Sequence, residues 1–261
     1  VCRQEGGAAM MAEAYGKMTG QPGVCFVTRG PGATNASAGV HIAMQDSTPM
    51  VLFVGQIDNR QTDRETFQEV DYRAMFGGLC KWVAQVDDTA RLPEYIARAF
   101  RVAMSGRPGP VVLALPENML SAAAEVADFT GQLRVTRRPD QAQIEALMVD
   151  FHAAKRPMVV VGGSVWTPDT AAAIARFADV QNVPVVTGFR RQDYMDNRHA
   201  CFAGDLNVGI NPKLAARIRE ADFLLLIGTR FGDIETQGYA LVDPAASAKT
   251  IAHIHCDADE I

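Results

Sequence analysis

Short runs of β-branched and aliphatic residues alternate along this chain with longer Ala-rich stretches, and this alternation restricts the fold more than any other feature. Buried strands of a parallel sheet are continuous apolar runs, and each is joined to the next by a crossover, usually a helix. The pattern therefore predicts βαβ units and an α/β fold with mainly parallel sheets. A chain of 261 residues is long enough for two such domains, each with its own core.

The first part of the chain predicts one doubly wound domain over residues 1–120. Gly20 is placed to end the first helix of this domain, because glycine adopts the left-handed conformation of a helix C-terminus at little cost. The expected helices cover residues 5–19, 33–44 and 92–104, and the expected strands cover residues 24–28, 50–55, 82–86 and 111–115.

A second βα series follows a stretch of weak periodicity. Residues 121–139 predict an interdomain linker, and residues 140–261 predict a second doubly wound, Rossmann-like domain. The expected helices of this domain cover residues 140–154, 170–181 and 212–220, and its strands cover residues 158–161, 184–187, 223–227 and 250–255. The chain begins at Val1 without an initiator Met and ends where a further helix is due, so we expect it to be a piece of a longer protein.

Charge and cysteine content exclude several classes of protein. The net charge of −5 offers no basic field for nucleic acid or for an anionic membrane surface. The five cysteines are scattered and form no C-x-x-C pair, which favours reduced thiols in a cytoplasmic protein over disulfides or a zinc site. The apolar runs are too short to cross a bilayer.

Three segments follow expected strands or open expected helices, where an open parallel sheet binds its ligands. Glu5 opens the first helix; residues 28–35 form a Gly-rich turn that leads into the second; and residues 66–69 follow the second strand. Each segment also has a purely structural interpretation. An acid is common in a first helical turn, a Gly-rich turn makes a tight bend, and residues 66–69 fit an ordinary helix start.

Taken together, these segments resemble the pyrimidine-binding domain of the thiamine-diphosphate-dependent acetolactate synthase, pyruvate oxidase and decarboxylase family. The resemblance is strong over residues 1–120 and looser over the second part, which resembles the central domain of that family. The motifs occur in the order and spacing of the family: Arg3-Gln4-Glu5-Gly6-Gly7-Ala8-Ala9, Val27-Thr28-Arg29-Gly30-Pro31-Gly32-Ala33-Thr34-Asn35, Asp46-Ser47-Thr48-Pro49-Met50, Gly55-Gln56, Phe67-Gln68-Glu69 and Gly106-Arg107-Pro108-Gly109-Pro110-Val111.

The resemblance implies roles for seven residues. Glu5 matches the family glutamate that hydrogen-bonds N1′ of the aminopyrimidine of the cofactor, and we expect its carboxyl group to be shielded from water with a raised pKa. The other matches concern the pyrimidine pocket and the reacting end of a neighbouring subunit's cofactor. The pocket residues are Gly30, Pro31, Gly32 and Asn35, and the residues toward the substrate channel are Phe67 and Gln68.

The resemblance also implies cofactors and partners. Thiamine diphosphate is the expected cofactor, with Mg²⁺ held by a third domain whose Gly-Asp-Gly motif does not occur in this chain. FAD is possible in the central domain, although residues 204–209 lack the Gly-Met-His-Gly pattern of FAD-using synthases. A homodimer or homotetramer with the active site between subunits is expected, and the first strand of the pyrimidine domain is expected to precede Val1.

The implied activity is decarboxylation of a 2-keto acid followed by carboligation, as in acetolactate synthases. Ile57-Asp58-Asn59-Arg60 stands where synthases usually carry a proline after the Gly-Gln pair, a departure beside the substrate channel. Two alternatives therefore stay open. One is a thiamine-diphosphate-dependent decarboxylase or acyl-CoA lyase, and the other is a non-catalytic nucleotide-binding or assembly member of the family.

Overall fold

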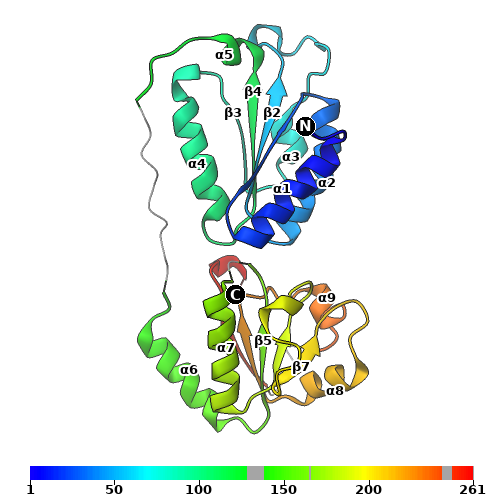
Figure 1. The fold of residues 1–261 in the computed structure, drawn as a ribbon, viewed down its shortest axis with the longest axis vertical. Coiled ribbons are helices and arrows are strands. Elements are labelled where there is room, and N and C mark those ends of the chain that lie inside the picture. The colour runs from blue at the N-terminus through cyan, green and yellow to red at the C-terminus, as the bar shows by residue number, and fades with distance from the viewer. Residues whose placement is uncertain (128–137, 165, 243–248, 261) are drawn as a thin grey trace. The chain divides into compact units, whose positions relative to one another are not determined.

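The computed structural model describes residues 1–127, 138–164, 166–242 and 249–260. Its internal contacts divide the chain into two compact units, Val1–Val135 and Thr136–Ile261. Each unit is a parallel sheet covered by helices (Figure 1), which confirms the predicted α/β class with two doubly wound domains.

The first unit contains a four-stranded sheet in the order β1-β2-β4-β3, in which every neighbouring pair is parallel. Its strands are β1 Gly23–Val27, β2 Met50–Gln56, β3 Trp82–Gln85 and β4 Pro110–Pro116. Its helices are α1 Glu5–Thr19, α2 Pro31–Gln45, α3 Tyr72–Phe76, α4 Leu92–Met104 and α5 Glu117–Ser121, with 3-10 turns at Asn59–Gln61 and Thr89–Arg91.

Both faces of this sheet are buried, because successive side chains of a strand point to opposite faces. Leu52 and Val54 of β2 lie in one core with α1, α2 and α3. Val51 and Phe53 of the same strand lie in the other core, against α4. The continuous apolar run of β2 therefore reflects a strand covered on both sides.

The second unit contains a five-stranded parallel sheet in the order β7-β6-β5-β8-β9. The chain leaves the central strand β5 first toward β6 and β7, and later crosses to β8 and β9 on the other side. Its strands are β5 Pro157–Val161, β6 Val185–Thr187, β7 Phe202–Asp205, β8 Phe223–Ile227 and β9 Thr250–Ile254. Its helices are α6 Gln141–Ala153, α7 Pro168–Gln181, α8 Pro212–Glu220 and α9 Asp233–Thr236, with 3-10 turns at Gln192–Tyr194 and Ala258–Glu260.

The predicted linker, residues 121–139, lies mostly outside the described residues, which stop at 127 and resume at 138. The described residues 122–127 form neither helix nor strand. Among the described helices, none has the length and apolar character needed to span a membrane.

Candidate active site

Glu5 lies in the first turn of α1, and its carboxylate meets a side chain of α2. The side chain of Gln4 caps the helix by accepting a hydrogen bond from the backbone N–H of Gly7 at 2.7 Å. Nδ2 of Asn35 donates a hydrogen bond to Oε2 of Glu5 at 3.1 Å. The two residues are 30 positions apart in sequence, so packing of the two helices brings them together.

Small residues allow this close packing of α1 on α2. A Cβ added to Gly6 would lie 3.0 Å from the backbone oxygen of Asn35, and one added to Gly39 would lie 2.5 Å from Cβ of Ala9. Real Cβ atoms do not approach other atoms closer than about 3 Å, so larger residues would force the helices apart. The Ala- and Gly-rich composition of both helices thus positions Glu5 against Asn35.

The charge state of Glu5 differs from the expectation. The hydrogen bond from Asn35 is the main cause that lowers the pKa of Glu5 below its ordinary value, helped by a backbone N–H and opposed by partial burial. A donor to the ionised form stabilises that form. The expected raised pKa is therefore wrong for this chain by itself, in which Glu5 is partly exposed and carries a carboxylate at neutral pH.

The Gly-rich turn predicted as a pocket loop lies beside this carboxylate. Gly30 precedes α2 with φ of 58°, and its backbone N–H donates a hydrogen bond to Oη of Tyr72 at 2.8 Å. Pro31 occupies the first turn of the helix, where a backbone N–H is not needed. A Cβ on the buried Gly32 would stand 2.8 Å from Cγ2 of Thr28 and 3.6 Å from Oε1 of Glu5, so glycine permits the start of α2 to pack closely on the end of β1 beside the carboxylate.

The segment predicted to face the substrate channel packs on the same turn. Gln68 has φ of 67°, and its Cβ would lie 2.8 Å from a Cβ added to Gly30, so these two positions are in direct contact. The segment is a turn rather than a helix start, held by the carboxylate of Glu69, which accepts a hydrogen bond from the backbone N–H of Thr66 at 3.1 Å. Phe67 is 77% exposed and points into no core.

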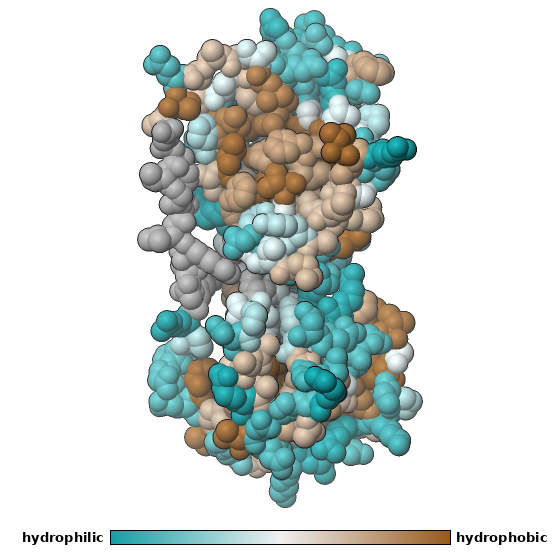
Figure 2. All heavy atoms as spheres, in the orientation of Figure 1, coloured by the Kyte–Doolittle hydropathy of each residue, from teal (hydrophilic) through white to brown (hydrophobic). Residues whose placement is uncertain are grey.

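A groove of about 810 Å³ runs past Glu5 along α1 and β1. Its walls are apolar and open: Met11, Tyr15 and Phe26 lie along it, and Phe26 is 70% exposed. Figure 2 shows hydrophobic residues gathered on the visible face of this unit.

Three residues around this site, Tyr72, Arg29 and Glu117, had no role predicted from the sequence. Tyr72 supports the backbone of Gly30, and burial raises the pKa of its hydroxyl group. Arg29 pairs with Glu117 of α5, and its buried Nε has no hydrogen-bond partner among the described residues. The sequence signal for Tyr72 was its position after Asp71, which caps the short helix α3. This helix has only five residues, too few to show a helical period in the sequence.

Residues 57–60, which depart from the synthase pattern, are held by local hydrogen bonds and by a contact with α5. Hydrogen bonds from the side chain and backbone of Arg60 hold the pKa of Asp58 at about 2. The backbone N–H of Asn59 donates to Oδ1 of Asn118 at 3.0 Å, which ties this segment to α5. Asp58 is therefore engaged as an ion-pair partner rather than free to exchange protons near neutral pH.

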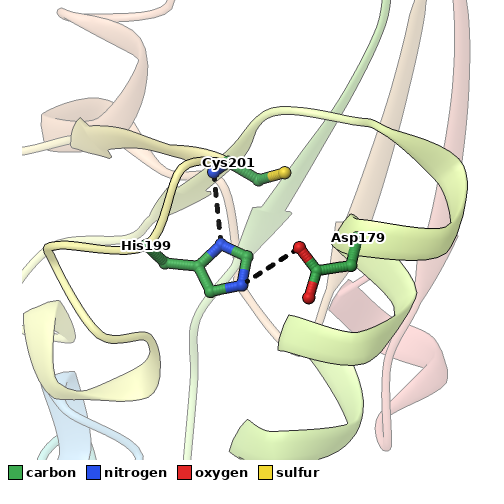
Figure 3. Close-up of side chains that lie close together, drawn as sticks. All are labelled: Asp179, His199 and Cys201. Atoms are coloured by element: carbon green, nitrogen blue, oxygen red, sulfur yellow. Dashed lines mark hydrogen bonds and ion pairs between the residues drawn. The ribbon is translucent and has the colours of Figure 1, made fainter.

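A cluster of possible metal ligands lies in the second unit, which contains none of the predicted site residues (Figure 3). Nε2 of His199 lies 3.4 Å from Oδ1 of Asp179, and Nδ1 of His199 accepts a hydrogen bond from the backbone N–H of Cys201 at 3.2 Å. Because Nδ1 accepts, the proton of the neutral ring sits on Nε2, toward Asp179. A metal on Nε2 would have to displace that proton, whereas ligating histidines normally donate through the other nitrogen. The arrangement instead supports the turn before β7.

Comparison with known proteins gives matches in both units. A family model described as "Thiamine pyrophosphate enzyme, N-terminal TPP binding domain" matches residues 1–75. A second model, described as "Thiamine pyrophosphate enzyme, central domain", matches residues 144–261. The first match contains Glu5, Gly30, Gly32 and Asn35.

Several curated proteins are similar over almost the whole chain. The chain is 31% identical to the acetolactate synthase large subunit of Lactococcus lactis over 269 residues, which cover 100% of this chain and 46% of that protein. It is 31% identical to the acetolactate synthase isozyme 2 large subunit of Escherichia coli, covering 99% of the chain and 46% of the relative. It is 32% identical to the acetolactate synthase large subunit of Corynebacterium glutamicum, over 99% of this chain and 42% of that protein. The chain thus spans slightly less than half the length of these relatives.

Proposed function

The chain belongs to the thiamine pyrophosphate enzyme family, and we propose that it supplies the pyrimidine-binding domain, residues 1–120, and the central domain, residues 140–261, of an acetolactate-synthase-like enzyme. That enzyme would decarboxylate a 2-keto acid and join the remaining acyl group to a second carbonyl compound. The observation that carries the proposal is the contact of Glu5 with Asn35 beside the Gly30 turn, at one end of an open apolar groove.

The residues around Glu5 fit the pyrimidine end of thiamine diphosphate. Glu5 would hydrogen-bond the ring nitrogen N1′, and Asn35 holds the carboxylate in one orientation by donating to its other oxygen. Gly32 lies beside this carboxylate, in van der Waals range of its Oε1. When bound, thiamine diphosphate supplies the nucleophilic carbon and the electron sink for decarboxylation. Glu5 holds and returns a proton at N1′, and a covered groove would raise its pKa toward that of the ring.

The substrate end of the site would be formed by the turn that contains Phe67 and Gln68. Gln68 is fixed by its contact with Gly30, so its position follows that of the pocket turn. The exposed ring of Phe67 offers an apolar surface to the reacting end of a cofactor in a neighbouring subunit. The donor and acceptor would both be small carbonyl compounds.

Mg²⁺ would be held by residues in the part of the relatives that this chain does not cover. Mg²⁺ requires a near-octahedral set of oxygen ligands around the diphosphate. Among the described residues, the cluster of possible metal ligands is that of Asp179, His199 and Cys201, whose nitrogen and sulfur atoms do not suit Mg²⁺. We therefore assign no diphosphate-binding role to the residues of this chain.

The proposed assembly is a homodimer or homotetramer with the active site between subunits. Its support is the match of residues 1–75 to the N-terminal thiamine-pyrophosphate-binding domain, because the resemblance implies an active site between subunits. We propose a cytoplasmic enzyme, consistent with five free cysteines. The decarboxylase, acyl-CoA lyase and non-catalytic alternatives are less well supported, since the similar proteins described above carry the name acetolactate synthase.

A panel assay tests this function. The full-length enzyme that contains this chain would be incubated with individual 2-keto acids, thiamine diphosphate and Mg²⁺, and both carbon dioxide release and the carbon skeleton of the product would be measured. We expect turnover of at least one 2-keto acid with formation of a hydroxy-keto acid. Release of an aldehyde alone would favour the decarboxylase, and lack of turnover with every 2-keto acid would contradict the proposal.

A further inference from the structure

The second unit contains the place where a doubly wound sheet binds a dinucleotide. The chain leaves β5 in one direction toward β6 and later crosses to β8 on the opposite side, so β5 and β8 flank the topological switch point. Ligands of such sheets bind in the crevice outside the carboxyl ends of these two strands. In this unit Gly162 and Gly163 follow β5, and Gly228 and Thr229 follow β8. FAD in the central domain would place its pyrophosphate here.

The two turns that flank the switch point are in direct contact. A Cβ added to Gly163 would lie 1.9 Å from the backbone oxygen of Gly228. A Cβ added to Gly228 would lie 2.7 Å from the backbone oxygen of Gly162. Both Gly163 and Gly228 have positive φ, at 77° and 71°. Glycine at these positions therefore permits the backbone of one turn to pack directly on the backbone of the other.

Side chains of the unit cover the turn after β5. Trp166 Nε1 donates a hydrogen bond to the backbone oxygen of Gly162, and Tyr194 Oη donates to that of Gly163, each at 2.8 Å. The two rings stack with their centroids 4.8 Å apart. Arg191, which is buried, also donates to the oxygen of Gly163. The guanidinium group of Arg191 is thus directed to a backbone carbonyl.

The helix after β5 is poorly suited to hold a phosphate group. A helix N-terminus binds anions through free backbone N–H groups and a positive dipole end. Pro168, at the first position of α7, has no N–H, and the hydroxyl group of Thr167 accepts the N–H of Thr170 at 3.2 Å. Asp169 adds a carboxyl group to the first turn. A pyrophosphate at this helix start would find no N–H on Pro168, an N–H of Thr170 that is already bonded to Thr167, and the carboxyl group of Asp169.

Glu235 belongs to α9, and its side chain contacts the turn after the neighbouring strand β6. This side chain is 9% exposed and accepts hydrogen bonds from the backbone N–H of Phe189, at 2.9 Å, and from the hydroxyl group of Thr229. A Cβ on Gly188 would lie 2.1 Å from its Oε1. The carboxyl group therefore takes the donors that an anionic ligand would use and joins the turns after β6 and β8.

From these contacts we infer that the protein's own residues close the switch point of the second unit, and that this unit holds neither FAD nor another pyrophosphate-bridged dinucleotide. The inference does not depend on the proposed reaction, because it concerns a different unit and different residues. It assigns the glycines of both turns to backbone packing, and Arg191 and Glu235 to holding the turns in place.

Flavin binding gives the test. The full-length protein that contains this chain would be purified, its flavin content measured by absorbance after denaturation, and its melting temperature followed during titration with FAD. We expect no stoichiometric flavin and no saturable rise in melting temperature. Flavin at one equivalent per chain, or a saturable FAD-dependent rise, would overturn the inference. Because neither readout needs turnover, a failed keto-acid assay cannot be mistaken for this result.

Two matched variants test the closing contacts. Glu235→Gln should lower the melting temperature of the second unit, because a neutral amide accepts the two hydrogen bonds less well. Glu220→Gln, at an exposed position of α8, is the control and should leave the melting temperature unchanged. A Glu235→Gln protein with unchanged stability, or one that gained FAD binding, would show that Glu235 does not hold the turns closed.

Discussion

The carboxylate of Glu5 is oriented by a neutral amide rather than by a cation. An amide donor fixes the position of the carboxylate without neutralising it, so the group can still accept a proton from a ligand. An arginine in place of Asn35 would hold the pKa of Glu5 much lower by direct charge attraction. The choice of Asn thus suits a carboxyl group that must change its protonation during a reaction.

Replacement of Asn35 should raise the pKa of Glu5. The amide donates to the ionised carboxylate, so Asn35→Ala removes the main cause of the lowered pKa and returns it toward the ordinary value. The measurement is a pH titration of the carboxyl ¹³C resonance of Glu5. Ser37→Ala, at a half-buried position of the same helix, is the control. An unchanged pKa in Asn35→Ala would mean that the hydrogen bond does not form in solution.

At this scale the sequence predicted the site residues through their motifs, and the structure brings Glu5, Asn35 and the Gly30 turn together. Their roles toward a cofactor stay a prediction. The pKa of Glu5 could not be predicted, because it depends on the hydrogen bond from Asn35 and on the exposure of the carboxyl group. The spacing of residues near Glu5 in the sequence determines neither of them. The same holds for Tyr72, whose contact with Gly30 joins residues 42 positions apart.

At the scale of elements, the packing of α1 on α2 determines the geometry of the site. Substitution of Gly39 by Ala should separate these helices, because the added Cβ would lie 2.5 Å from Cβ of Ala9 and 2.8 Å from its backbone carbon. We expect a loss of about 1–3 kcal/mol in the free energy of unfolding, the usual range for overpacking. Urea denaturation measures it. Gly78→Ala is the matched control, since a Cβ there meets nothing within 4 Å.

Equal stabilities of the Gly39→Ala and Gly78→Ala proteins would contradict this description of the helix contact. The binding of thiamine diphosphate to the full-length enzyme gives a second readout. Gly39→Ala should weaken it, because displacement of α2 moves Asn35 away from Glu5.

The hydroxyl group of Tyr72 supports the pocket turn from α3. Tyr72→Phe leaves the buried N–H of Gly30 without its partner, and an unsatisfied buried donor costs about 1–3 kcal/mol. Chemical denaturation should show this loss. Tyr15→Phe, at an exposed position of α1, should change the free energy of unfolding by less than about 0.5 kcal/mol. A loss in Tyr72→Phe no larger than in Tyr15→Phe would remove the assigned role.

Long helices and apolar strands could be predicted from the sequence, and the short helices could not. The helix at 92–104 and the strand at 223–227 were predicted with the bounds that α4 and β8 have. The strand β7 was missed, because Phe202-Ala203-Gly204-Asp205 has no β-branched run and is a strand only by pairing with β6. The helices α3, α5 and α9 have four or five residues each, too few to show a helical period.

At the scale of the whole molecule, the proposed function gives this chain one end of a two-ended cofactor site. The pyrimidine end has Glu5, Asn35 and the Gly30 turn, whereas the diphosphate carries most of the charge and needs Mg²⁺ with oxygen ligands. We therefore predict that the 261-residue chain alone binds thiamine diphosphate weakly and turns over no 2-keto acid. Calorimetric titration with the cofactor and Mg²⁺ measures the first and a coupled assay the second. Stoichiometric micromolar binding would place the phosphate site within this chain.

Turnover of a Glu5→Gln variant in the full-length enzyme tests the central claim most directly. The glutamine side chain keeps the size and the hydrogen bond with Asn35 but cannot exchange a proton with N1′. We predict that folding is intact and that kcat falls by about 10²–10⁴-fold, the usual contribution of a general acid–base group. Glu94→Gln, an exposed acid of α4 paired with Arg91, is the control and should retain kcat. Near-normal turnover of the Glu5→Gln enzyme would show that Glu5 only begins a helix.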